Sequence, residues 1–217
     1  MGAERSTGRY IAVEGPIGVG KTALARRLAE AFGSELLPER EEANPFLRKF
    51  YEDPERYALE TQLSFTLDRY RQQQDLARRG VGPGGVVADY LFAKDGIFAG
   101  VTLADDELGL YRQIFQLLDA QMLRPDLVVF LEARTDVLVR RIRKRHRDFE
   151  RGITPEYLGR LTDAFRSFFY QYTDTPLLVV NCSEIDFVEH GGDLADLIRE
   201  VRSMKQGVRH YIPLGSN

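Results

Sequence analysis

The stretch that decides the fold of this chain is Gly15-Pro16-Ile17-Gly18-Val19-Gly20-Lys21-Thr22. It follows the apolar run 10–13 and leads directly into an amphipathic stretch at 23–29. This order of strand, glycine-rich loop and helix is the context in which the pattern G-x-x-x-x-G-K-T marks a phosphate-binding loop. Backbone N–H groups and the helix N-terminus attract phosphate oxygens, Lys21 reaches the outer phosphates, and the Thr22 hydroxyl can bind Mg²⁺. The sequence therefore predicts that the chain binds a nucleoside triphosphate.

Length and composition are those of one globular domain. The chain has 217 residues, of which 43% are hydrophobic and 29% are charged, and such values are ordinary for soluble proteins. The net charge of −3, from 30 basic and 33 acidic residues, argues against a general nucleic-acid or membrane-surface binder. We expect a single domain over residues 1–217, with 1–8 and 207–217 as flexible tails.

Cysteine usage and hydropathy bear on the compartment. Cys182 is the single cysteine, and a chain without an internal disulfide suits a reducing cytoplasm. Residues 1–8 contain no apolar segment of the kind found in signal peptides. No apolar run approaches the length that spans a bilayer. We therefore expect a cytoplasmic protein with no membrane partner.

The rest of the chain alternates between strand and helix patterns. Five short apolar runs, rich in β-branched residues, read as buried parallel strands at 10–14, 35–39, 85–89, 127–131 and 177–181. Helical patterns cover 21–32, 54–79, 105–122, 135–147, 155–172 and 193–205. This alternation predicts an α/β fold with a five-stranded, mostly parallel sheet covered by helices on both faces. Ligands of such sheets bind at the carboxyl ends of the strands.

Two of those strand ends carry carboxylates. Asp89 ends the third apolar run, where a P-loop protein commonly holds Mg²⁺, although an aspartate there can also cap the next helix. Glu39 ends the second run, where a carboxylate can accept a proton from an attacking hydroxyl. Glu41 and Glu42 lie beside it. Spacing alone does not choose among the three glutamates, and a solvated acidic loop is the alternative.

Two further segments carry groups suited to a nucleotide substrate. The run 140–147 is densely basic and suits an arginine lid that closes over a transferred phosphoryl group, with a nucleic-acid patch or a solvated helix end as alternatives. Gln62, Phe65 and Arg69 share one face of a long predicted helix. An amide there can pair with the edge of a nucleobase, and an aromatic ring can stack on it. The three histidines show no metal-ligand spacing, so we expect no zinc site.

These motifs, in this order, resemble the deoxynucleoside kinase family over roughly residues 9–204. The resemblance rests on the phosphate loop from Glu14 to Thr22, the segment 44–57 that begins Asn-Pro-Phe-Leu, the helix with Gln62 and Arg69, and the lid at 141–153. It implies an arginine-lidded P-loop kinase, a homodimer, that uses Mg·ATP to phosphorylate the 5′-hydroxyl of a deoxynucleoside. The Asn-Pro-Phe-Leu and Phe-Tyr stretches favour the purine branch.

The resemblance also implies roles for single residues. Glu39 lies five residues before the Asn-Pro pair and is selected as the general base. The implied substrate contacts are Tyr51 and Glu150 for the 3′-hydroxyl, and Gln62, Phe65, Arg69 and Asp95 for the base. The implied ATP contacts are Lys21, Arg145 and Arg147 for the phosphates, Thr22 and Asp89 for the metal, and Arg141, Asp186 and Phe187 for the adenine.

One departure stands out. The family has an Asp/Glu-Arg-Ser triplet at the end of the third strand, whereas this chain has Asp89-Tyr90-Leu91. The arginine that would touch both the substrate phosphate and the general base is therefore replaced by Tyr90. Arg40 or a lid arginine is a candidate substitute. The alternatives are a P-loop kinase of another small acceptor, and a weakly active or inactive nucleotide-binding relative.

Overall fold

A computed structural model describes residues 8–145, 147, 150, 152–185 and 191–212. One parallel sheet of six strands forms its centre, in the order β2-β3-β1-β4-β5-β6. The strands are β1 (Tyr10–Glu14), β2 (Glu35–Leu37), β3 (Val86–Ala88), β4 (Leu127–Glu132), β5 (Leu177–Asn181) and β6 (Val208–Tyr211). The predicted α/β fold with a parallel sheet is confirmed, with six strands instead of five.

The sixth strand corrects the prediction of a flexible tail at 207–217 for residues 208–211, which form β6, while 213–217 lie outside the described residues. β6 pairs with β5 from Leu177↔Val208 to Val180↔Tyr211. Its side chains are largely exposed, because it is an edge strand, and it therefore lacks the apolar run that marks the buried strands. The pairing satisfies the edge of β5 through backbone hydrogen bonds, which side-chain hydropathy does not reveal.

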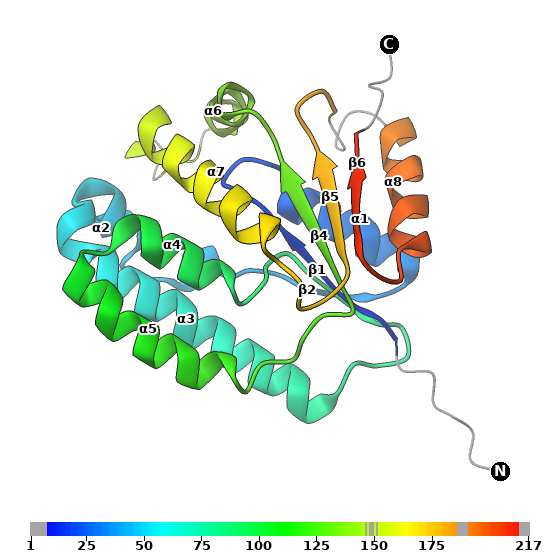
Figure 1. Cartoon of the computed structure of the whole chain (residues 1–217), viewed down its shortest axis with the longest axis horizontal. Helices are drawn as coiled ribbons and strands as arrows, with labels where there is room; N and C mark the ends of the chain where they lie inside the picture. The colour runs from blue at the N-terminus through cyan, green and yellow to red at the C-terminus, as the bar shows by residue number, and fades with distance from the viewer. Residues whose placement is uncertain (1–7, 146, 148–149, 151, 186–190, 213–217) are drawn as a thin grey trace.

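Helices cover both faces of the sheet (Figure 1). On one face, α1 (Lys21–Phe32), α6 (Thr135–Lys144) and α8 (Gly191–Ser203) build a core with alternate strand residues such as Val13 and Val129. On the other, α7 (Pro155–Tyr170) and α4 (Lys94–Thr102) pack on the intervening residues, such as Ala12 and Phe130. Because successive side chains of a strand point to opposite faces of the sheet, the same strands contribute to both cores.

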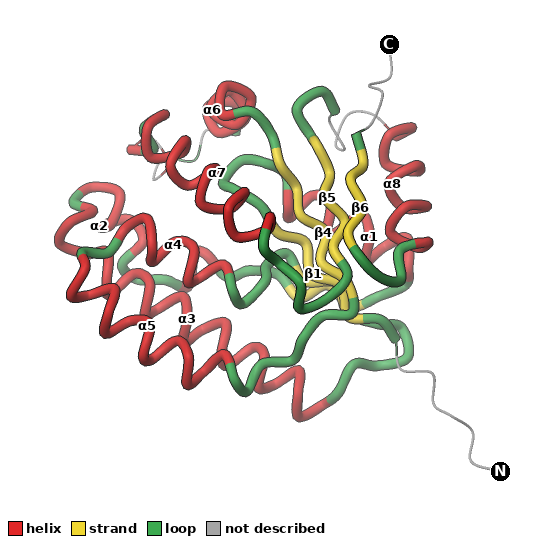
Figure 2. Tube along the Cα trace, in the orientation of Figure 1, coloured by secondary structure: helices red, strands yellow, loops and turns green. Residues whose placement is uncertain are grey.

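A further group of helices extends from the α4 side, as the tube in Figure 2 shows. It contains α2 (Leu47–Glu52), the 26-residue α3 (Pro54–Arg79) and α5 (Asp105–Asp119), which share a core with α4. Asp53 caps α3 by accepting a hydrogen bond from the Arg56 N–H, and Pro54 occupies its first turn. No described helix is long and apolar enough to cross a membrane.

Candidate active site

The phosphate loop is folded around its glycines. Gly15 has φ 153°, and a Cβ there would lie 2.3 Å from the Leu131 carbonyl oxygen, so the loop crosses β4 too closely for a side chain. Gly20 has φ 109° and is the N-cap residue of α1. The Lys21 ammonium donates to the carbonyl oxygens of Gly15 at 2.8 Å and Pro16 at 3.2 Å. The loop thus has the strand–loop–helix geometry that binds phosphate groups.

Thr22 and Asp89 lie together beneath this loop. The Asp89 carboxylate accepts the Glu39 N–H, and the neighbouring Thr22 hydroxyl favours its charged form. Burial, followed by the nearby Glu39 charge, raises the pKa of Asp89. A hydroxyl and a carboxylate at the foot of a phosphate loop form the donor set that P-loop proteins offer to Mg²⁺. The structure therefore brings together the two residues predicted to serve the metal.

Glu39 lies in a buried cluster of charges. Its carboxylate accepts two hydrogen bonds from the Lys94 ammonium, at 2.9 and 2.7 Å, and one from Arg69. Burial alone would raise the pKa of Glu39, but attraction to Lys94, Arg69 and Lys21 outweighs it and lowers the pKa. Glu39 is consequently a carboxylate and a proton acceptor at neutral pH.

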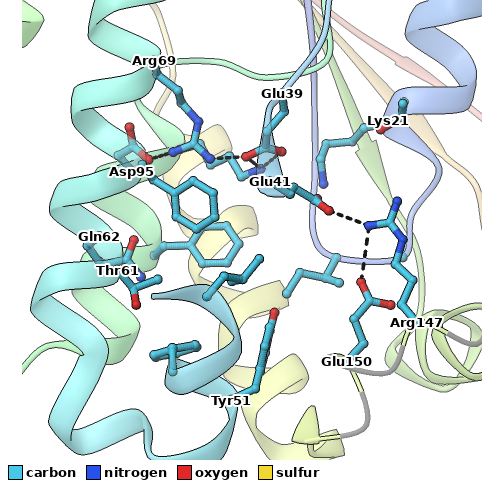
Figure 3. A pocket seen from close by; sticks show the side chains of 18 of the residues that line it. Lys21, Glu39, Glu41, Tyr51, Thr61, Gln62, Arg69, Asp95, Arg147 and Glu150 are labelled. Atoms are coloured by element: carbon cyan, nitrogen blue, oxygen red, sulfur yellow. Dashed lines mark hydrogen bonds and ion pairs between the residues drawn. The ribbon is translucent and has the colours of Figure 1, made fainter. Parts of the chain in front are cut away.

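The α3–α4 side of the cavity carries polar groups suited to a nucleobase (Figure 3). Arg69 is bonded to Asp95 as well as to Glu39, and its guanidinium lies 4.7 Å from the centre of the Phe65 ring. Gln62 is buried and donates to the Thr102 hydroxyl at 3.3 Å. The Arg69 Nε donor and the Asp95 Oδ2 acceptor are buried without a hydrogen-bond partner. Such atoms are costly unless a bound molecule satisfies them.

The opposite side holds the described part of the predicted lid. Arg145 donates to Glu150 from Nε at 2.6 Å and from its guanidinium end, while Arg147 pairs with Glu41 at 2.5 Å. Figure 3 shows Arg147 between Glu41 and Glu150, with Tyr51 below them. Burial raises the pKa of Tyr51 well above its ordinary value, so its phenol is neutral and can donate a hydrogen bond.

The remaining predicted ATP contacts lie farther out. Arg141 donates to the carbonyl oxygens of Val19, Cys182 and Ile185, which joins α6 to the phosphate loop and to the segment after β5. It also lines a shallow hollow shared with Lys144 and Ser183. Asp186 and Phe187, the other predicted adenine contacts, lie outside the described residues.

These groups enclose one cavity of about 260 Å³. It lies beside the carboxyl ends of β1, β2 and β3, as expected for a parallel sheet. Most of the predicted site residues line it: Ile17, Gly18, Gly20, Lys21, Thr22, Glu39, Tyr51, Gln62, Phe65, Arg69, Asp95, Arg145, Arg147 and Glu150. Asp89 and Arg141 do not line the cavity. Asp89 accepts a hydrogen bond from Glu39, which does, and Arg141 donates to the Val19 carbonyl of the phosphate loop.

Comparisons with known proteins decide the family. The family model described as deoxynucleoside kinase matches residues 11–205. This chain belongs to the deoxynucleoside kinase family.

The sequence of this kinase is similar to those of named relatives over nearly its whole length. It is 33% identical over 204 residues to a deoxyguanosine kinase of Bacillus subtilis, covering 92% of this chain and 99% of the relative. It is 34% identical over 203 residues to a deoxyadenosine kinase of Dictyostelium discoideum, covering 91% and 81%. A solved deoxyadenosine kinase from M. mycoides with bound dATP superposes with a TM-score of 0.78 at 23% identity, over 89% of this chain and 99% of that one, which supports the fold.

Membership makes the chain a transferase that phosphorylates a deoxynucleoside with ATP, as the resemblance implied. Nothing in the comparisons favours another small acceptor or an inactive relative. Sequence reasoning missed one group in this kinase site: Lys94, which begins α4 and touches Glu39. No motif in the sequence marks Lys94, and the predicted helices did not include α4, on which it lies.

Proposed function

We propose that this kinase transfers the γ-phosphoryl group of Mg·ATP to the 5′-hydroxyl of a purine deoxynucleoside. The observation that carries the proposal is the position of Glu39. Its carboxylate lies in the cavity with the phosphate loop on one side and Gln62, Arg69 and Asp95 on the other (Figure 3). A nucleoside with its base among those three residues would direct its 5′ end toward Glu39 and Lys21.

In this arrangement Glu39 acts as the general base. The 5′-oxygen forms a bond to the γ-phosphorus, the bond from that phosphorus to the β,γ-bridging oxygen breaks, and the hydroxyl proton passes to Glu39. Lys21, Arg145 and Arg147 stabilise the negative charge on the transferred group. Tyr51 and Glu150 line the same cavity and are proposed to bind the 3′-hydroxyl of the sugar.

Thr22 and Asp89 would hold Mg²⁺. Thr22 begins α1 directly after the phosphate loop and lies close enough to Asp89 to favour its charged form, which supports this assignment. The described residues contain no cluster of three or more His, Cys, Asp or Glu side chains able to hold a metal by themselves, so phosphate oxygens and water would complete the coordination shell. A bound Mg²⁺ neutralises charge on the phosphates. Arg141, Asp186 and Phe187 remain the proposed contacts of the ATP adenine.

The named relatives favour purines, and two buried polar atoms favour a nucleobase in the cavity. The relatives described above are named deoxyguanosine and deoxyadenosine kinases. The unpartnered Arg69 Nε and Asp95 Oδ2 atoms offer one donor and one acceptor beside the Gln62 amide. The edge of a nucleobase carries both donors and acceptors, so a bound base can satisfy these buried groups, and the preference for a purine rests on the named relatives.

We also propose a cytoplasmic homodimer. Leu67 of α3 and Leu110 and Leu117 of α5 are exposed by 44%, 52% and 71%. Leu110 and Leu117 are seven residues apart, so they share one face of α5. A second copy of the chain packed on this face would bury them. Sedimentation velocity should give the mass of two chains, and a single-chain mass at micromolar concentration would contradict the proposal.

Substitution of Glu39 tests the proposed chemistry. Glu39→Gln keeps the shape of the side chain but removes the proton acceptor, so kcat for deoxynucleoside phosphorylation should fall by about 10²–10⁴-fold. Product is measured as radiolabelled monophosphate. Protection against thermal unfolding by ATP should persist, because the phosphate loop is unchanged.

The matched control is Glu42→Gln, on the neighbouring exposed turn, which should keep kcat within about twofold because exposed substitutions perturb little. Glu39→Asp retains the charge and covers the case in which the amide variant does not fold. A folded Glu39→Gln enzyme with nearly full kcat would refute the assignment of the base.

A further inference from the structure

Lys94 is a buried cation that the predicted mechanism does not use. It is the first residue of α4 and only 5% exposed. Its ammonium donates to both carboxylate oxygens of Glu39, at 2.9 and 2.7 Å, and its side chain lines the cavity. A lysine is almost never buried to this extent unless it is paired.

The residue at position 90 borders this cluster without bonding Glu39: the Tyr90 ring lies 5.8 Å from the Arg69 guanidinium. Tyr90 is fully buried, packs with Tyr10, Leu76 and Val86, and directs its hydroxyl toward the amides of Gln72 and Gln73, 3.5 and 3.4 Å away. It therefore serves a core beneath α3. Tyr90 therefore does not replace the charge of the arginine expected at this position.

The other candidate substitutes are engaged elsewhere. Arg40 is half-exposed and pairs with Asp68 at 3.4 Å. Arg145 is bonded to Glu150, and Arg147 pairs with Glu41. The second cation bonded to Glu39 is Arg69, but this guanidinium is shared with Asp95 and stacks on Phe65, at the end of the cavity proposed for the base.

A chain of buried contacts fixes Lys94 next to the phosphate loop. The Glu14 carboxylate, fully buried, accepts the N–H groups of Gly15 and Leu91, each at 2.8 Å. The Leu91 carbonyl in turn accepts the Lys94 N–H at 3.0 Å. The same carboxylate therefore anchors the first glycine of the phosphate loop and the turn that begins α4. Lys94 and Lys21 line the same cavity.

We propose that Lys94 does the work expected of the arginine at position 90, by holding the Glu39 carboxylate charged and oriented toward the 5′-hydroxyl. It is a positioning residue for Glu39, and the proposal rests on the proposed function of that carboxylate. During transfer the hydroxyl proton passes to Glu39, the 5′-oxygen bonds the γ-phosphorus, and ADP leaves. Lys94 keeps its own proton throughout and, when Glu39 is neutralised, its charge is free to pair with the new phosphate ester.

Lys94→Met tests this role, because methionine preserves much of the side-chain length without the charge. We expect kcat to fall by roughly 10²–10³-fold, within the range that positioned acid–base groups contribute, while KM for the deoxynucleoside changes less than about threefold. Loss of the cation raises the pKa of Glu39, so the acid limb of the kcat–pH profile should move to higher pH. Lys94→Arg should restore most of the activity.

Lys205→Met, the same change at an exposed site after α8, is the control and should match the unmodified enzyme. A Lys94→Met protein with native circular dichroism, unchanged kcat and an unmoved acid limb would overturn the proposal. So would a Lys94→Arg protein as inactive as Lys94→Met, because arginine keeps the positive charge and the N–H donors that methionine lacks. If Lys94→Met does not fold, Lys94→Gln provides the same comparison.

A second readout separates this proposal from the proposed function. The Glu39 carboxyl signal can be followed by ¹³C NMR titration, assigned by its loss in Glu39→Gln. Its pKa should be higher in Lys94→Met than in the unmodified protein, whichever substrate the enzyme accepts. An upward shift in a protein that phosphorylates no deoxynucleoside would refute the proposed function alone, whereas an identical Glu39 pKa in both proteins would refute the role of Lys94.

Discussion

Lys21 lies close enough to Lys94 for the two ammonium charges to repel each other. Burial, followed by this repulsion, lowers the pKa of Lys21 to about 8, although Glu14 and Glu39 oppose the shift. The phosphates of ATP would stabilise the protonated form and raise the pKa again. Binding near pH 8 should therefore take up about half a proton, and affinity should fall as the pH rises above 8.

Isothermal titration calorimetry in two buffers of different ionisation enthalpy measures this proton uptake directly. Lys21→Arg is the informative control, since an arginine stays charged over this range and its variant should bind ATP with no uptake. Proton release at pH 8, or an uptake that survives in Lys21→Arg, would contradict the assignment to Lys21.

At the residue scale, sequence patterns located the parts of the site that have fixed spacing. Lys21 and Thr22 follow from the phosphate-loop pattern. Spacing alone left Glu39 among three glutamates, and only the family resemblance, with its base five residues before an Asn-Pro pair, selected it. Lys94 could not be found in this way, because a single lysine in an apolar segment carries no motif. Its pairing with Glu39 exists only after β2 and β3 are neighbours in the sheet.

At the element scale, the glycines of the phosphate loop and of α4 should behave in opposite ways. Gly15 has φ 153° and no room for a Cβ against the Leu131 carbonyl, so Gly15→Ala should lower the free energy of unfolding by about 2–4 kcal/mol. Gly100 is exposed within α4, and a Cβ there meets nothing within 4 Å. Gly100→Ala should raise the free energy of unfolding by about 0.5–1 kcal/mol.

Urea unfolding followed by circular dichroism measures both changes as shifts of the midpoint. The two variants control for each other, since each adds one methyl group. Destabilisation by Gly100→Ala would argue against a helical α4 with an open surface at that position. A neutral Gly15→Ala would argue against the close crossing of the loop over β4.

Of the elements that sequence analysis missed, which include α2, two were missed for clear physical reasons. α4 contains Gly96 and Gly100 together with β-branched residues, all weak helix formers, and is held by packing on α3 and α7. β6 is exposed and depends on backbone pairing with β5. By contrast, β1, β5, α1 and α3 were predicted with the bounds observed, because strong hydropathy patterns and capping signals act locally.

At the scale of the whole molecule, the fold determines where the chemistry occurs. Parallel strands bring the ends of β1, β2 and β3 to one edge, which places the phosphate loop, Glu39 and Asp89 side by side. The helices α3 and α4 extend the cavity away from that edge and supply Gln62 and Asp95. Sequence alone predicted the strand-end groups as neighbours, whereas the shape of the cavity depends on packing among helices far apart in the chain.

The most direct test is a steady-state assay of the purified protein with ATP, Mg²⁺ and each of the four deoxynucleosides. We predict 5′-monophosphate products from deoxyguanosine and deoxyadenosine, with kcat/KM roughly tenfold or more above that for deoxycytidine and thymidine, the scale of discrimination that pocket contacts supply. Equal or higher kcat/KM for the pyrimidines would contradict the purine assignment, and the absence of any ATP-dependent monophosphate from a folded, ATP-binding protein would contradict the account as a whole.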